Sequence, residues 1–377
     1  MKIAIDIRNI GKGRTGDEVV FFELVRHLAQ IDAQNEYHLL IDMRADDALR
    51  RIETQLDITG KENFQLVPCG TGNKFVWNAI TASRYCRRKK IDIYHTQYII
   101  PFFMPSWTKI VTHIHDVSFC AHKELIKKSD AFFLNILIPR AIKKSHAVVA
   151  VSQFTKDEIV RYYHCPQEKV CVIPNAVSMY CDPLLRAEDV RAKYHVPEMF
   201  IMALGTMQPR KNISFLIEVF VSLAQERGDV SLVLVGKKDH NFDLMIQRVL
   251  GSYPQVADRV IFTGYVSDAE KCCLYKMARV FAFPSIYEGF GIPILEAFSV
   301  GTPVVASDIL PHREVAGEGA LYCDPQSIDQ WKKMLYDVLD NDKMRKDLQK
   351  GSQEQIIKFS WKESAQKLVS LYKSLCG

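Results

Sequence analysis

The sequence Ser285-Ile286-Tyr287-Glu288-Gly289-Phe290-Gly291-Ile292-Pro293-Ile294-Leu295-Glu296-Ala297-Phe298 carries the pattern that decides the fold. The apolar run Val280–Phe283 before it is typical of a short buried strand. The two glycines of the stretch mark a loop whose backbone passes close to another group, and Pro293 stands where a helix takes its first residue. A strand, a glycine loop and a helix start, in this order, direct backbone N–H groups toward an anion or a polar ligand. With Glu288 in the loop and Glu296 early in the helix, we interpret this stretch as the ligand-binding centre of the chain.

Length and composition indicate a soluble globular protein of two domains. The chain has 377 residues, more than one compact core usually holds, with 48% hydrophobic and 25% charged residues. No window reaches the roughly 18 apolar residues that a membrane-spanning helix needs. The first residues, Met1–Ile7, meet the acidic Asp6 early and are typical of a first strand rather than a signal peptide. The net charge of +5 permits a polyanionic ligand or an anionic membrane surface but requires neither.

The ten cysteines show no CxxC pair and no repeated metal-binding spacing. Without an export signal, we expect them to be reduced thiols in a cytoplasmic protein.

Short strands alternate with helical patterns through both halves, which predicts βαβ units and parallel sheets with both faces covered. In the first half the expected strands are residues 2–9, 37–41, 64–68, 91–95, 109–115, 147–152 and 170–173. A linker rich in turn residues follows at 174–183. In the second half the expected strands are residues 200–205, 231–236, 260–263, 280–283, 303–306 and 320–323, with a helical pattern from about residue 328 onward. The sequence therefore predicts an α/β protein of two Rossmann-like halves with a helical tail.

The segment Gly11-Lys12-Gly13-Arg14-Thr15-Gly16 matches GxGxxG between the first expected strand and helix, the context that a dinucleotide fingerprint requires. Asp42, at the end of the second expected strand, could hold a ribose there. Lys12 and Arg14 would crowd a pyrophosphate while adding positive charge to it. Three interpretations stay open: a glycine-rich loop over a cleft, a phosphate or acceptor contact, and NAD binding.

A histidine and an acid end the strand in Val111-Thr112-His113-Ile114-His115-Asp116-Val117. Alternation points His113 and His115 to the same side, which leaves a two-histidine metal site as an alternative, although no third ligand stands at a suitable spacing. His115 also lies at the carboxyl end of an expected parallel strand, where open α/β sheets bind their ligands. A hydrogen-bonded interior histidine is an equal alternative.

Basic and aromatic residues follow three expected strands of the second half. Arg210 and Lys211 lie beside a helix start, where two cations and the helix dipole favour an anion, and we interpret them as a phosphate site. The pair Lys237-Lys238 fits solvated surface charge better. Tyr265-Val266 could offer backbone groups to a flat ring.

The segment Asn73–Lys90 has apolar residues at helical spacing and ends in four consecutive basic residues, and the aromatic run Phe102–Trp107 follows soon after. Two interpretations stay open: a core-facing helix with a solvated end, and a basic amphipathic surface that touches a membrane. Nucleic acid is not an expected partner, because no basic stripe alternates with aromatic residues.

Together these motifs resemble a known family. The chain is similar over essentially its whole length to GT-B fold retaining glycosyltransferases of glycosyltransferase family 4, a group 1, mannosyltransferase-like family. The resemblance rests on Glu288 and Glu296 at E-x7-E spacing, the loop Pro209–Asn212, the pair His115-Asp116 and the loop Gly11–Gly16, which stand in the family's order.

The resemblance implies two Rossmann-like domains that face a central cleft. It implies an acceptor-side domain over residues 1–176 and a donor-binding domain over residues 177–357. A last helix, at about 358–377, would return to the first domain, with Phe359 and Trp361 as anchors.

The resemblance also implies roles for individual residues. Glu288 would contact hydroxyls of the donor sugar and Glu296 the ribose, while Tyr265-Val266 would meet the base. The implied catalytic residues are His115, Arg210, Lys211 and Glu288. The implied donor-binding residues are Gly16, Gly205, Arg210, Lys211, Tyr265, Val266, Glu288, Gly289, Phe290, Gly291, Ile292 and Glu296. Many relatives carry an arginine where this chain has Thr206, so we expect phosphate binding to depend more strongly on Arg210 and Lys211.

The implied activity is transfer of a hexose, of mannose or glucose type, from a nucleotide-diphosphate sugar such as GDP-mannose or a UDP-hexose. The implied acceptor is a glycan or lipid-linked glycan in cell-surface polysaccharide or lipopolysaccharide synthesis. Fixed cations and helix N–H groups can stabilise a diphosphate leaving group, so no metal ion and no other cofactor is expected. The expected location is the cytoplasm, with peripheral contact at the inner face of the cytoplasmic membrane.

Two other functions remain as alternatives. One is a sugar-nucleotide epimerase on the same double-Rossmann plan, which would convert its donor without an acceptor. The other is a non-catalytic sugar-nucleotide or NAD-binding protein, which the GxGxxG segment suggests.

Overall fold

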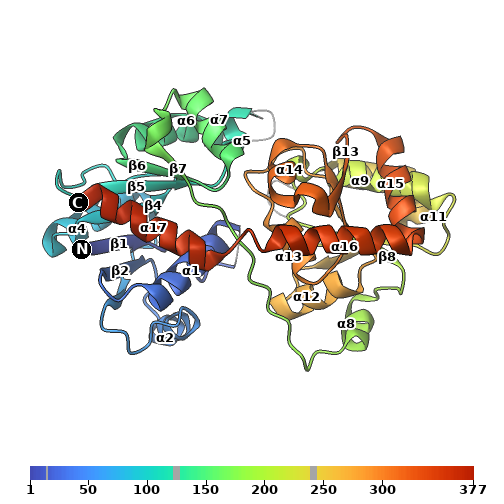
Figure 1. Ribbon diagram of the computed structural model, residues 1–377, viewed down its shortest axis with the longest axis horizontal. Helices are drawn as coiled ribbons and strands as arrows, with labels where there is room; N and C mark the ends of the chain where they lie inside the picture. The colour runs from blue at the N-terminus through green and yellow to red at the C-terminus, as the bar shows by residue number, and fades with distance from the viewer. Residues whose placement is uncertain (14–15, 122–127, 238–243) are drawn as a thin grey trace. The chain divides into compact units, whose positions relative to one another are not determined.

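A computed structural model describes residues 1–13, 16–121, 128–237 and 244–377 (Figure 1). These residues form two compact units: unit 1 comprises Met1–Ala176 and Ser360–Gly377, and unit 2 comprises Val177–Phe359. Arg14, Thr15 and Lys238, which belong to predicted loops, lie outside the described residues.

Unit 1 contains a seven-stranded parallel sheet in the order β3-β2-β1-β4-β5-β6-β7. Its strands are β1 (Lys2–Asp6), β2 (Glu36–Ile41), β3 (Phe64–Pro68), β4 (Ile93–Gln97), β5 (Lys109–Ile114), β6 (Ala147–Ala150) and β7 (Val170–Val172). Ile3 on β1 pairs with Tyr37 on one side and with Ile93 on the other. The chain therefore builds outward from β1 in one direction and then from β4 in the other, which makes the β1–β4 boundary a topological switch point.

Helices cover this sheet because its strands are apolar on both faces and need cover on both. The described helices and helical turns of unit 1 are α1 (Gly16–Ile31), α2 (Asp46–Gln55), α3 (Lys74–Val76), the π-helical turn η1 (Trp77–Thr81), α4 (Ala82–Lys89), α5 (Ser118–Ala121), α6 (Lys128–Lys144), α7 (Gln153–Tyr163), η3 (Gln167–Lys169) and α17 (Trp361–Cys376).

Unit 2 contains a six-stranded parallel sheet in the order β10-β9-β8-β11-β12-β13, whose switch point lies between β8 and β11. Its strands are β8 (Phe200–Leu204), β9 (Ser231–Val235), β10 (Val260–Gly264), β11 (Val280–Phe283), β12 (Val304–Ser307) and β13 (Ala320–Cys323). Its described helices are α8 (Ala187–Tyr194), η4 (Pro209–Lys211), α9 (Ile213–Ala224), α10 (Leu244–Ser252), α11 (Pro254–Ala257), α12 (Asp268–Met277), α13 (Ile292–Ser299), α14 (Leu310–Ala316), η5 (Gly317–Gly319), α15 (Ile328–Asp340) and α16 (Asp342–Ile356).

The predicted α/β class, with two parallel sheets, is confirmed. The expected strand at 91–95 was placed too early, since β4 begins at Ile93. The reason is the end of α4: Lys90 adopts a left-handed backbone, and the Ile91 N–H donates to the Cys86 carbonyl. Ile91 therefore completes the helix end, and only the residues after it are available for strand pairing.

Helix α17 belongs to unit 1 although it ends the chain, and Figure 1 shows it beside α1. The Ser364 hydroxyl donates to the Pro174 carbonyl at 2.6 Å, and the Tyr372 hydroxyl lies 2.6 Å from Nδ1 of His95 on β4. Trp361 is buried in unit 1, while the Phe359 ring packs edge-on against Phe290 in unit 2 at 5.5 Å. The two aromatic residues predicted as anchors are thus each packed, one in each unit.

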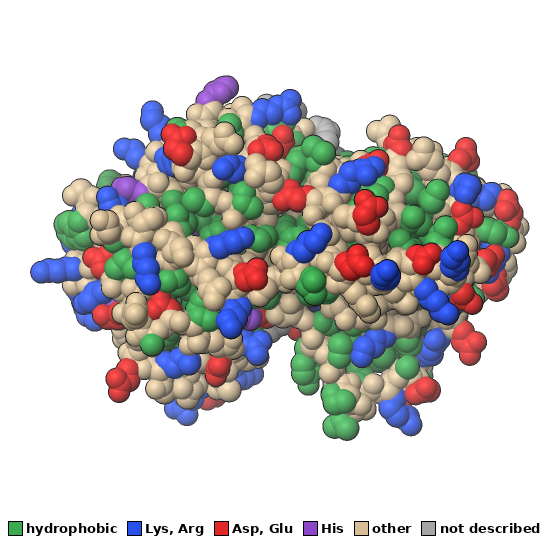
Figure 2. All heavy atoms as spheres, viewed as in Figure 1, with side chains coloured by type: hydrophobic (Ala, Val, Ile, Leu, Met, Phe, Trp, Pro, Cys, Tyr) green, Lys and Arg blue, Asp and Glu red, His purple; other side chains and the backbone are tan. Residues whose placement is uncertain are grey.

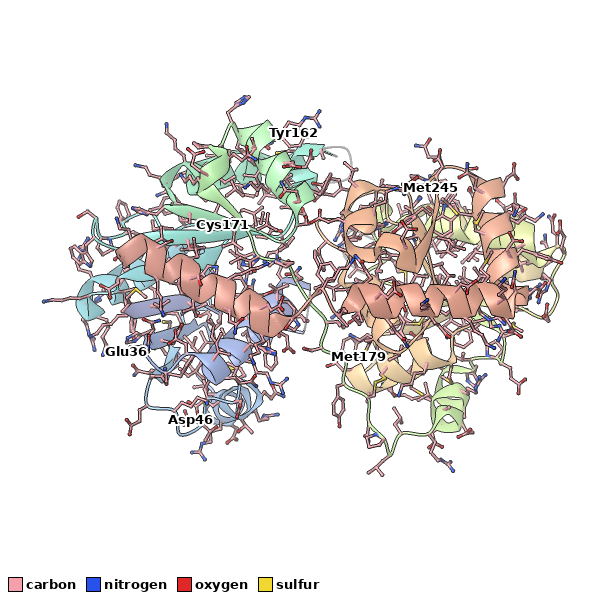
Figure 3. All side chains as sticks on the ribbon, in the orientation of Figure 1. Glu36, Asp46, Tyr162, Cys171, Met179 and Met245 are labelled. Carbon is pink, nitrogen blue, oxygen red and sulfur yellow. A yellow bond between two sulfur atoms is a disulfide. The ribbon has the colours of Figure 1, made fainter. Side chains whose placement is uncertain are left out.

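The expectation that all cysteines are reduced is wrong for one pair. Cys181 and Cys272 of unit 2 form a disulfide with Cα atoms 5.4 Å apart, 91 residues apart in sequence. Cys181 follows Met179 in the segment that opens unit 2, and Cys272 lies on α12 (Figure 3). The pairing depends on tertiary contact, which sequence spacing does not report. The other eight cysteines are free, among them Cys171 on the edge strand β7.

Charges of both signs are interspersed over the face drawn in Figure 2, in keeping with the mild net charge. None of the helices described is both long and apolar enough to span a membrane.

Candidate functional site

Two loops meet at the switch point of unit 2. Strands β8 and β11 are neighbours, with Met202 paired to Phe281, so the loops that leave their carboxyl ends lie side by side. The Ile286 N–H donates to the Arg210 carbonyl at 3.0 Å, which fixes the loop after β11 to the loop after β8. Residues about 75 positions apart in sequence are therefore held together by the sheet order.

The Glu288 carboxylate is the point where these loops converge. Lys211 Nζ donates to its Oε1 at 2.5 Å, and Arg210 Nη1 donates to its Oε2 at 3.1 Å. The carboxylate and the ammonium are nearly buried, while about a quarter of the Arg210 side chain is exposed. The sequence predicted these three residues as separate contacts for sugar and phosphate; the structure joins them in one ion cluster.

The neighbouring cations Lys211 and Arg210 keep Glu288 ionised. Burial alone would raise its pKa, but the Lys211 ammonium and the Arg210 guanidinium outweigh burial and lower this pKa to about 2. Glu288 is therefore ionised at neutral pH. A carboxylate held by two cations is an acceptor for ligand hydroxyls rather than a proton donor.

The start of α13 follows this cluster. Gly291, with φ of 124°, precedes the helix and adopts a backbone that residues with a side chain rarely reach. The Phe290 ring is buried, and the Phe359 ring packs edge-on against it. The first N–H groups of a helix have no intrahelical partner. In α13 they belong to the turn that begins at Ile292, shortly after Glu288 in the sequence.

The carboxyl ends of β8, β9 and β10 all close on glycine, at Gly205, Gly236 and Gly264. A Cβ on Gly236 would come within 2.0 Å of the Gly205 carbonyl oxygen, and the Gly236 N–H donates to Gly264 at 3.0 Å. This close backbone packing requires glycine at position 236. At Gly205 a Cβ would lie 3.5 Å from the Lys211 side chain, so this strand end packs directly against Lys211.

Glu296, predicted to bind a ribose, is held from α12. Lys271 Nζ donates to its Oε1 at 2.6 Å, and the Tyr275 hydroxyl donates to its Oε2 at 3.1 Å. Burial lowers the pKa of Lys271, but the carboxylates of Glu296 and Asp268 together raise it above its ordinary value. Ser267 and Glu270 form a capping box that fixes the start of α12. Such a motif typically contributes about 1 kcal/mol to helix stability.

Lys271 and Tyr275 were not predicted as site residues. The available signal was their spacing of four, which places both on one helix face. Which carboxylate they would meet depends on the packing of α12 against α13, which sequence periodicity does not give.

The predicted base contact follows β10. Tyr265 is 59% exposed, with Lys237 Nζ 5.6 Å from its ring centre, whereas Val266 is buried. Tyr265 can therefore present an aromatic face as well as backbone groups.

His312 on α14 is a third residue that sequence reasoning missed. It is fully buried, its ring centre lies 4.7 Å from that of Phe283, and its Nδ1 bonds to the Ser307 carbonyl at 2.9 Å. Burial lowers the pKa of His312 to about 4, although the Glu288 carboxylate acts in the opposite direction. Neutral His312 donates through Nδ1, so Nε2 is a lone-pair acceptor; among the described residues it has no hydrogen-bond partner.

In unit 1 the predicted alternation of His113 and His115 is confirmed. Their rings stack at 4.7 Å, and His95 on β4 stacks on His113 at 5.7 Å. Burial lowers the pKa of His95 to about 3 and that of His113 well below its ordinary value, so both are neutral at neutral pH. His115 Nε2 lies 3.2 Å from Gln97 Oε1. Parallel stacked rings do not converge their lone pairs, and no metal-binding cluster of three or more ligands occurs in the described part of the chain.

The GxGxxG loop is closed by its own helix. The Gly11 N–H donates to Glu18 Oε1 at 2.8 Å, so a carboxylate of α1 occupies a position that an anion would take. Asp42 accepts from the N–H groups of Thr71 and Gly72 at 2.6 and 2.9 Å, and it lies 3.9 Å from Lys12 Nζ. Neither arrangement favours a dinucleotide here.

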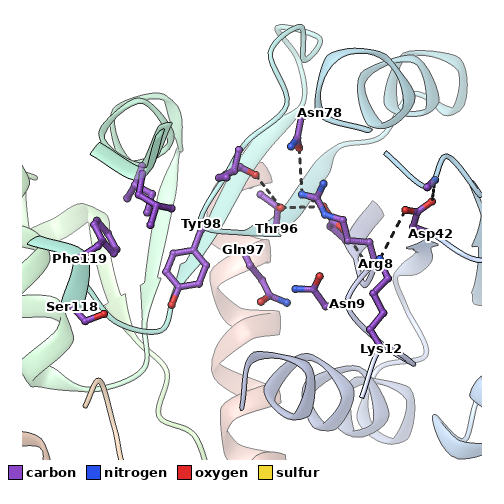
Figure 4. A pocket seen from close by; sticks show the side chains of 15 residues that line it. Arg8, Asn9, Lys12, Asp42, Asn78, Thr96, Gln97, Tyr98, Ser118 and Phe119 are labelled. Carbon is purple, nitrogen blue, oxygen red and sulfur yellow. Dashed lines mark hydrogen bonds and ion pairs between the residues drawn. The ribbon is translucent and has the colours of Figure 1, made fainter. Parts of the chain in front are cut away.

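A pocket of about 630 Å³ lies at the switch point of unit 1 (Figure 4). Asp6 ends β1 beneath it and accepts from the Trp77 indole, the Tyr94 hydroxyl and the Thr96 hydroxyl. The Arg8 guanidinium lies 3.0 Å from Asp6, donates to Asn78 at 3.3 Å, and stands 5.2 Å above the Trp77 ring. Arg8 is thereby held in one position at the pocket wall.

The structure thus groups most predicted residues within unit 2. Arg210, Lys211 and Glu288 form one ion cluster. Glu296 lies on α13, the helix that follows the Glu288 loop, and accepts a hydrogen bond from Lys271 of α12. His115 and Gly16 belong to unit 1.

Two family models match the chain. The model described as Glycosyl transferases group 1 matches residues 187–355, and the model described as Glycosyltransferase Family 4 matches residues 14–179. The first covers the Glu288 cluster. The second covers His115 and the lining residues of the unit 1 pocket from Asp42 onward, but not Asp6, Arg8, Asn9 and Lys12.

Named relatives agree with these models. The chain is 28% identical to O-antigen chain mannosyltransferase B of Escherichia coli over 386 residues, covering 100% of both chains. It is 27% identical to O-antigen chain mannosyltransferase RfbU of Salmonella typhimurium, covering 89% of this chain and 90% of that protein. The solved structure of Anabaena HepE in complex with UDP-glucose superposes with a TM-score of 0.75 at 16% identity, covering 99% of this chain and 100% of that one. The structural likeness shows the fold.

Proposed function

The chain belongs to the glycosyltransferases, with a family 4 domain followed by a group 1 domain, and from this premise we propose that it transfers mannose from GDP-mannose to a glycan acceptor. The named relatives that span its length are O-antigen mannosyltransferases, which supports a mannose-type sugar and a cell-surface polysaccharide product. UDP-glucose, which HepE binds, is the competing donor class.

The observation that carries the proposal is the convergence of Arg210 and Lys211 on Glu288 at the β8–β11 switch point. An ammonium has three donors and a guanidinium has five, so both side chains can bind a diphosphate while they hold Glu288. Glu288 in turn accepts from sugar hydroxyls. One ion cluster thus fits both halves of a nucleotide-diphosphate sugar.

The remaining donor contacts follow from the same unit. Glu296 has two lone-pair sites on each oxygen, so it can accept from ribose hydroxyls while Lys271 and Tyr275 orient it. The exposed Tyr265 offers a face for the base.

We propose that the reaction retains the configuration of the sugar by a front-face mechanism without a metal ion. The bond between the sugar C1 and the phosphate oxygen breaks, and a bond from C1 to the acceptor oxygen forms on the same face. The acceptor's hydroxyl proton passes to an oxygen of the departing diphosphate. Arg210 and Lys211 stabilise the charge of the diphosphate, and Glu288, held by both cations, does not act as the nucleophile.

A thermal-shift panel tests the donor assignment. We expect GDP and GDP-mannose to raise the melting temperature of the full chain, because these ligands bind the folded protein and not the unfolded chain. UDP and UDP-glucose should raise it less, and NAD should not. Stabilisation by NAD without an effect of any nucleoside diphosphate would contradict the assignment.

An apolar surface patch on unit 1 supports peripheral membrane contact, which we also propose. It consists of exposed side chains from α3, η1 and the loop after β4: Phe75, Val76, Ile80, Phe102, Phe103 and Trp107. The Phe102 N–H donates to the Asn78 carbonyl at 2.9 Å, which joins the two segments. The basic end of α4 is adjacent in sequence, and both Cys86 of α4 and Trp77 of η1 are buried. The burial of Trp77 and Cys86 fits the core-facing interpretation of segment 73–90, and the exposed apolar side chains support the proposed membrane contact.

Flotation with anionic vesicles tests this contact. We expect the full chain to float with phosphatidylglycerol vesicles and the double variant Phe103→Ser, Trp107→Ser to remain largely in the soluble fraction. The matched control is Leu184→Ser in unit 2, which also removes an exposed apolar side chain but lies outside the patch. Wild-type protein that stays unbound, or equal losses in both variants, would contradict the proposal.

A further inference from the structure

The disulfide of unit 2 joins an exposed segment to a buried helix position. The segment is residues 177–186, which open unit 2; the structure describes all of them, and every one is exposed or half-buried. The Asp182 carboxylate accepts from the Leu184 N–H at 2.9 Å, a hydrogen bond within the segment itself. Cys181 belongs to this segment, whereas Cys272 on α12 is 1% exposed. The disulfide therefore fixes a loop that buries little surface of its own to the core of unit 2.

Helix α12 also carries the two side chains that hold Glu296. Lys271 Nζ and the Tyr275 hydroxyl donate to the Glu296 carboxylate at 2.6 and 3.1 Å. Cys272 stands between them in the sequence and on an adjacent face of the helix, because successive helical residues point about 100° apart. A bond that fixes Cys272 thus also fixes the helix from which Glu296 is held.

Helix α8 supplies a second link to α12. The two helices pack together (Figure 1), and Lys193 Nζ of α8 lies 2.5 Å from Glu270 Oε1 of α12. More than half of the Lys193 side chain is exposed, and exposed ion pairs contribute little to stability. The covalent bond is therefore the stronger of these two links between α12 and the chain that precedes β8.

The bond is placed for attack by a thiol. Cys181 is half-buried, so a thiolate can approach its sulfur from solvent, while the buried Cys272 sulfur is the leaving group. The neighbouring free Cys273 is not a competing nucleophile, because burial raises the pKa of its thiol and keeps it protonated at neutral pH. The sequence predicts a cytoplasmic protein, and disulfides in reducing compartments are usually transient or redox-sensing.

We propose that the Cys181–Cys272 disulfide is a redox switch for donor binding, and that a small thiol of the glutathione class reduces it. The thiolate attacks Cys181 Sγ and forms a mixed disulfide, and Cys272 leaves as a thiolate that takes a proton. A second small thiolate attacks the small-thiol sulfur of the mixed disulfide, and Cys181 leaves and takes a proton. Two small thiols thereby become one small disulfide, and both cysteines become thiols.

Reduction releases residues 177–186 from α12, so the Lys271 ammonium and the Tyr275 hydroxyl are held less firmly at Glu296. The proposal rests on the proposed function, since it regulates the ribose contact assigned to Glu296. The cations that hold Glu288 belong to a different loop, at Arg210 and Lys211. We therefore expect reduction to weaken donor binding rather than to slow the chemical step.

Binding of a nucleoside diphosphate, GDP or UDP, to the full chain with and without millimolar reduced glutathione tests the proposal. Alkylation followed by mass spectrometry counts the free thiols, which should rise from eight to ten on reduction. The dissociation constant, measured by calorimetry, should increase roughly tenfold in the reduced chain. The kcat at saturating donor should stay within about twofold, because the interactions of the transition state are retained.

A variant separates the bond from other effects of the reductant. Cys181→Ser removes the disulfide by a conservative change at a half-buried position. Without reductant it should bind the nucleotide as weakly as the reduced wild type, and glutathione should not weaken it further. The matched control is Cys376→Ser, which removes an exposed free cysteine and should keep the full response to glutathione. Melting temperatures check that each form is folded at the temperature of the binding measurement.

Three results would overturn the proposal and leave the proposed function standing. They are equal nucleotide affinity in the oxidised and reduced chains, a Cys181→Ser variant that binds like the oxidised wild type, and ten free thiols in the chain purified without reductant. A lower melting temperature on reduction with unchanged affinity belongs to the first of these, since it would make the bond structural only. Absence of GDP and UDP binding in both forms would contradict the proposed function together with the switch.

Discussion

Replacement of Lys211 by alanine is expected to lower kcat for sugar transfer by roughly 100- to 1,000-fold, the usual cost of one preorganised charge-stabilising group. The ammonium is fixed by Glu288 at 2.5 Å, so it needs no reorganisation when the diphosphate departs. Thr206, earlier in the same loop, carries no charge, so Arg210 and Lys211 are the cations that this loop offers to a diphosphate. The measurement is steady-state transfer at saturating donor.

Two further variants separate catalysis from folding. Lys211→Gln retains most of the side chain's packing and should lose a similar factor in kcat. Lys276→Ala, an exposed lysine on α12, should behave like wild type. A Lys211→Ala protein that folds and keeps near wild-type kcat would show that the diphosphate is not bound here.

Replacement of Glu288 by glutamine is expected to lower kcat/KM by roughly 100-fold. The amide has nearly the shape of the carboxylate but only one acceptor oxygen. It carries no charge, so it cannot form ion pairs with Lys211 and Arg210. Glu318→Gln, at an exposed position in the same unit, is the matched control. Full activity of the Glu288 variant would remove this residue from the donor site.

The same variant has a signature in stability. Because the pKa of Glu288 is about 2 in the folded chain and 4.5 ordinarily, its ionised form stabilises the fold above about pH 4.5. This contribution is lost as the pH falls toward 2. The melting temperature of the wild type should therefore fall more steeply than that of Glu288→Gln as the pH is lowered from about 5 to 3. Parallel curves would contradict the ion cluster.

Local patterns were sufficient for the fold and for the loops of the site. Apolar runs between helical patterns located the strands of the two described sheets, although β4 begins later than expected, because parallel strands buried on both faces are continuously hydrophobic. The carboxyl ends of those strands then located Arg210, Lys211 and the Glu288 loop, because ligands of open sheets bind at these ends.

Contacts between helices and between distant loops could not be read from the sequence. The sequence showed two acids and two cations but not that both cations hold Glu288 while Lys271 holds Glu296. The disulfide between Cys181 and Cys272 depends on the packing of the segment that opens unit 2. No residue spacing in the sequence pointed to His312, because its position beside Phe283 depends on how α14 packs in the folded unit.

The glycine loop at residues 11–16 shows the limit of motif matching. The pattern and its place between strand and helix fit a dinucleotide fingerprint. The Glu18 carboxylate, two residues after the motif, takes the Gly11 N–H. A pattern of glycines does not report which acceptor its N–H groups meet.

The most direct test is a transfer assay with the purified full chain, a neutral mannose oligosaccharide, and either GDP-mannose or UDP-glucose, in the presence of EDTA. Mass spectrometry of the acceptor and NMR of the new linkage give the result. We predict that the acceptor gains a hexose from GDP-mannose, that one GDP is released for each transfer, and that the new linkage keeps the anomeric configuration of the donor. No hexose gain with either donor, or conversion of the donor to an epimer without acceptor, would contradict the account.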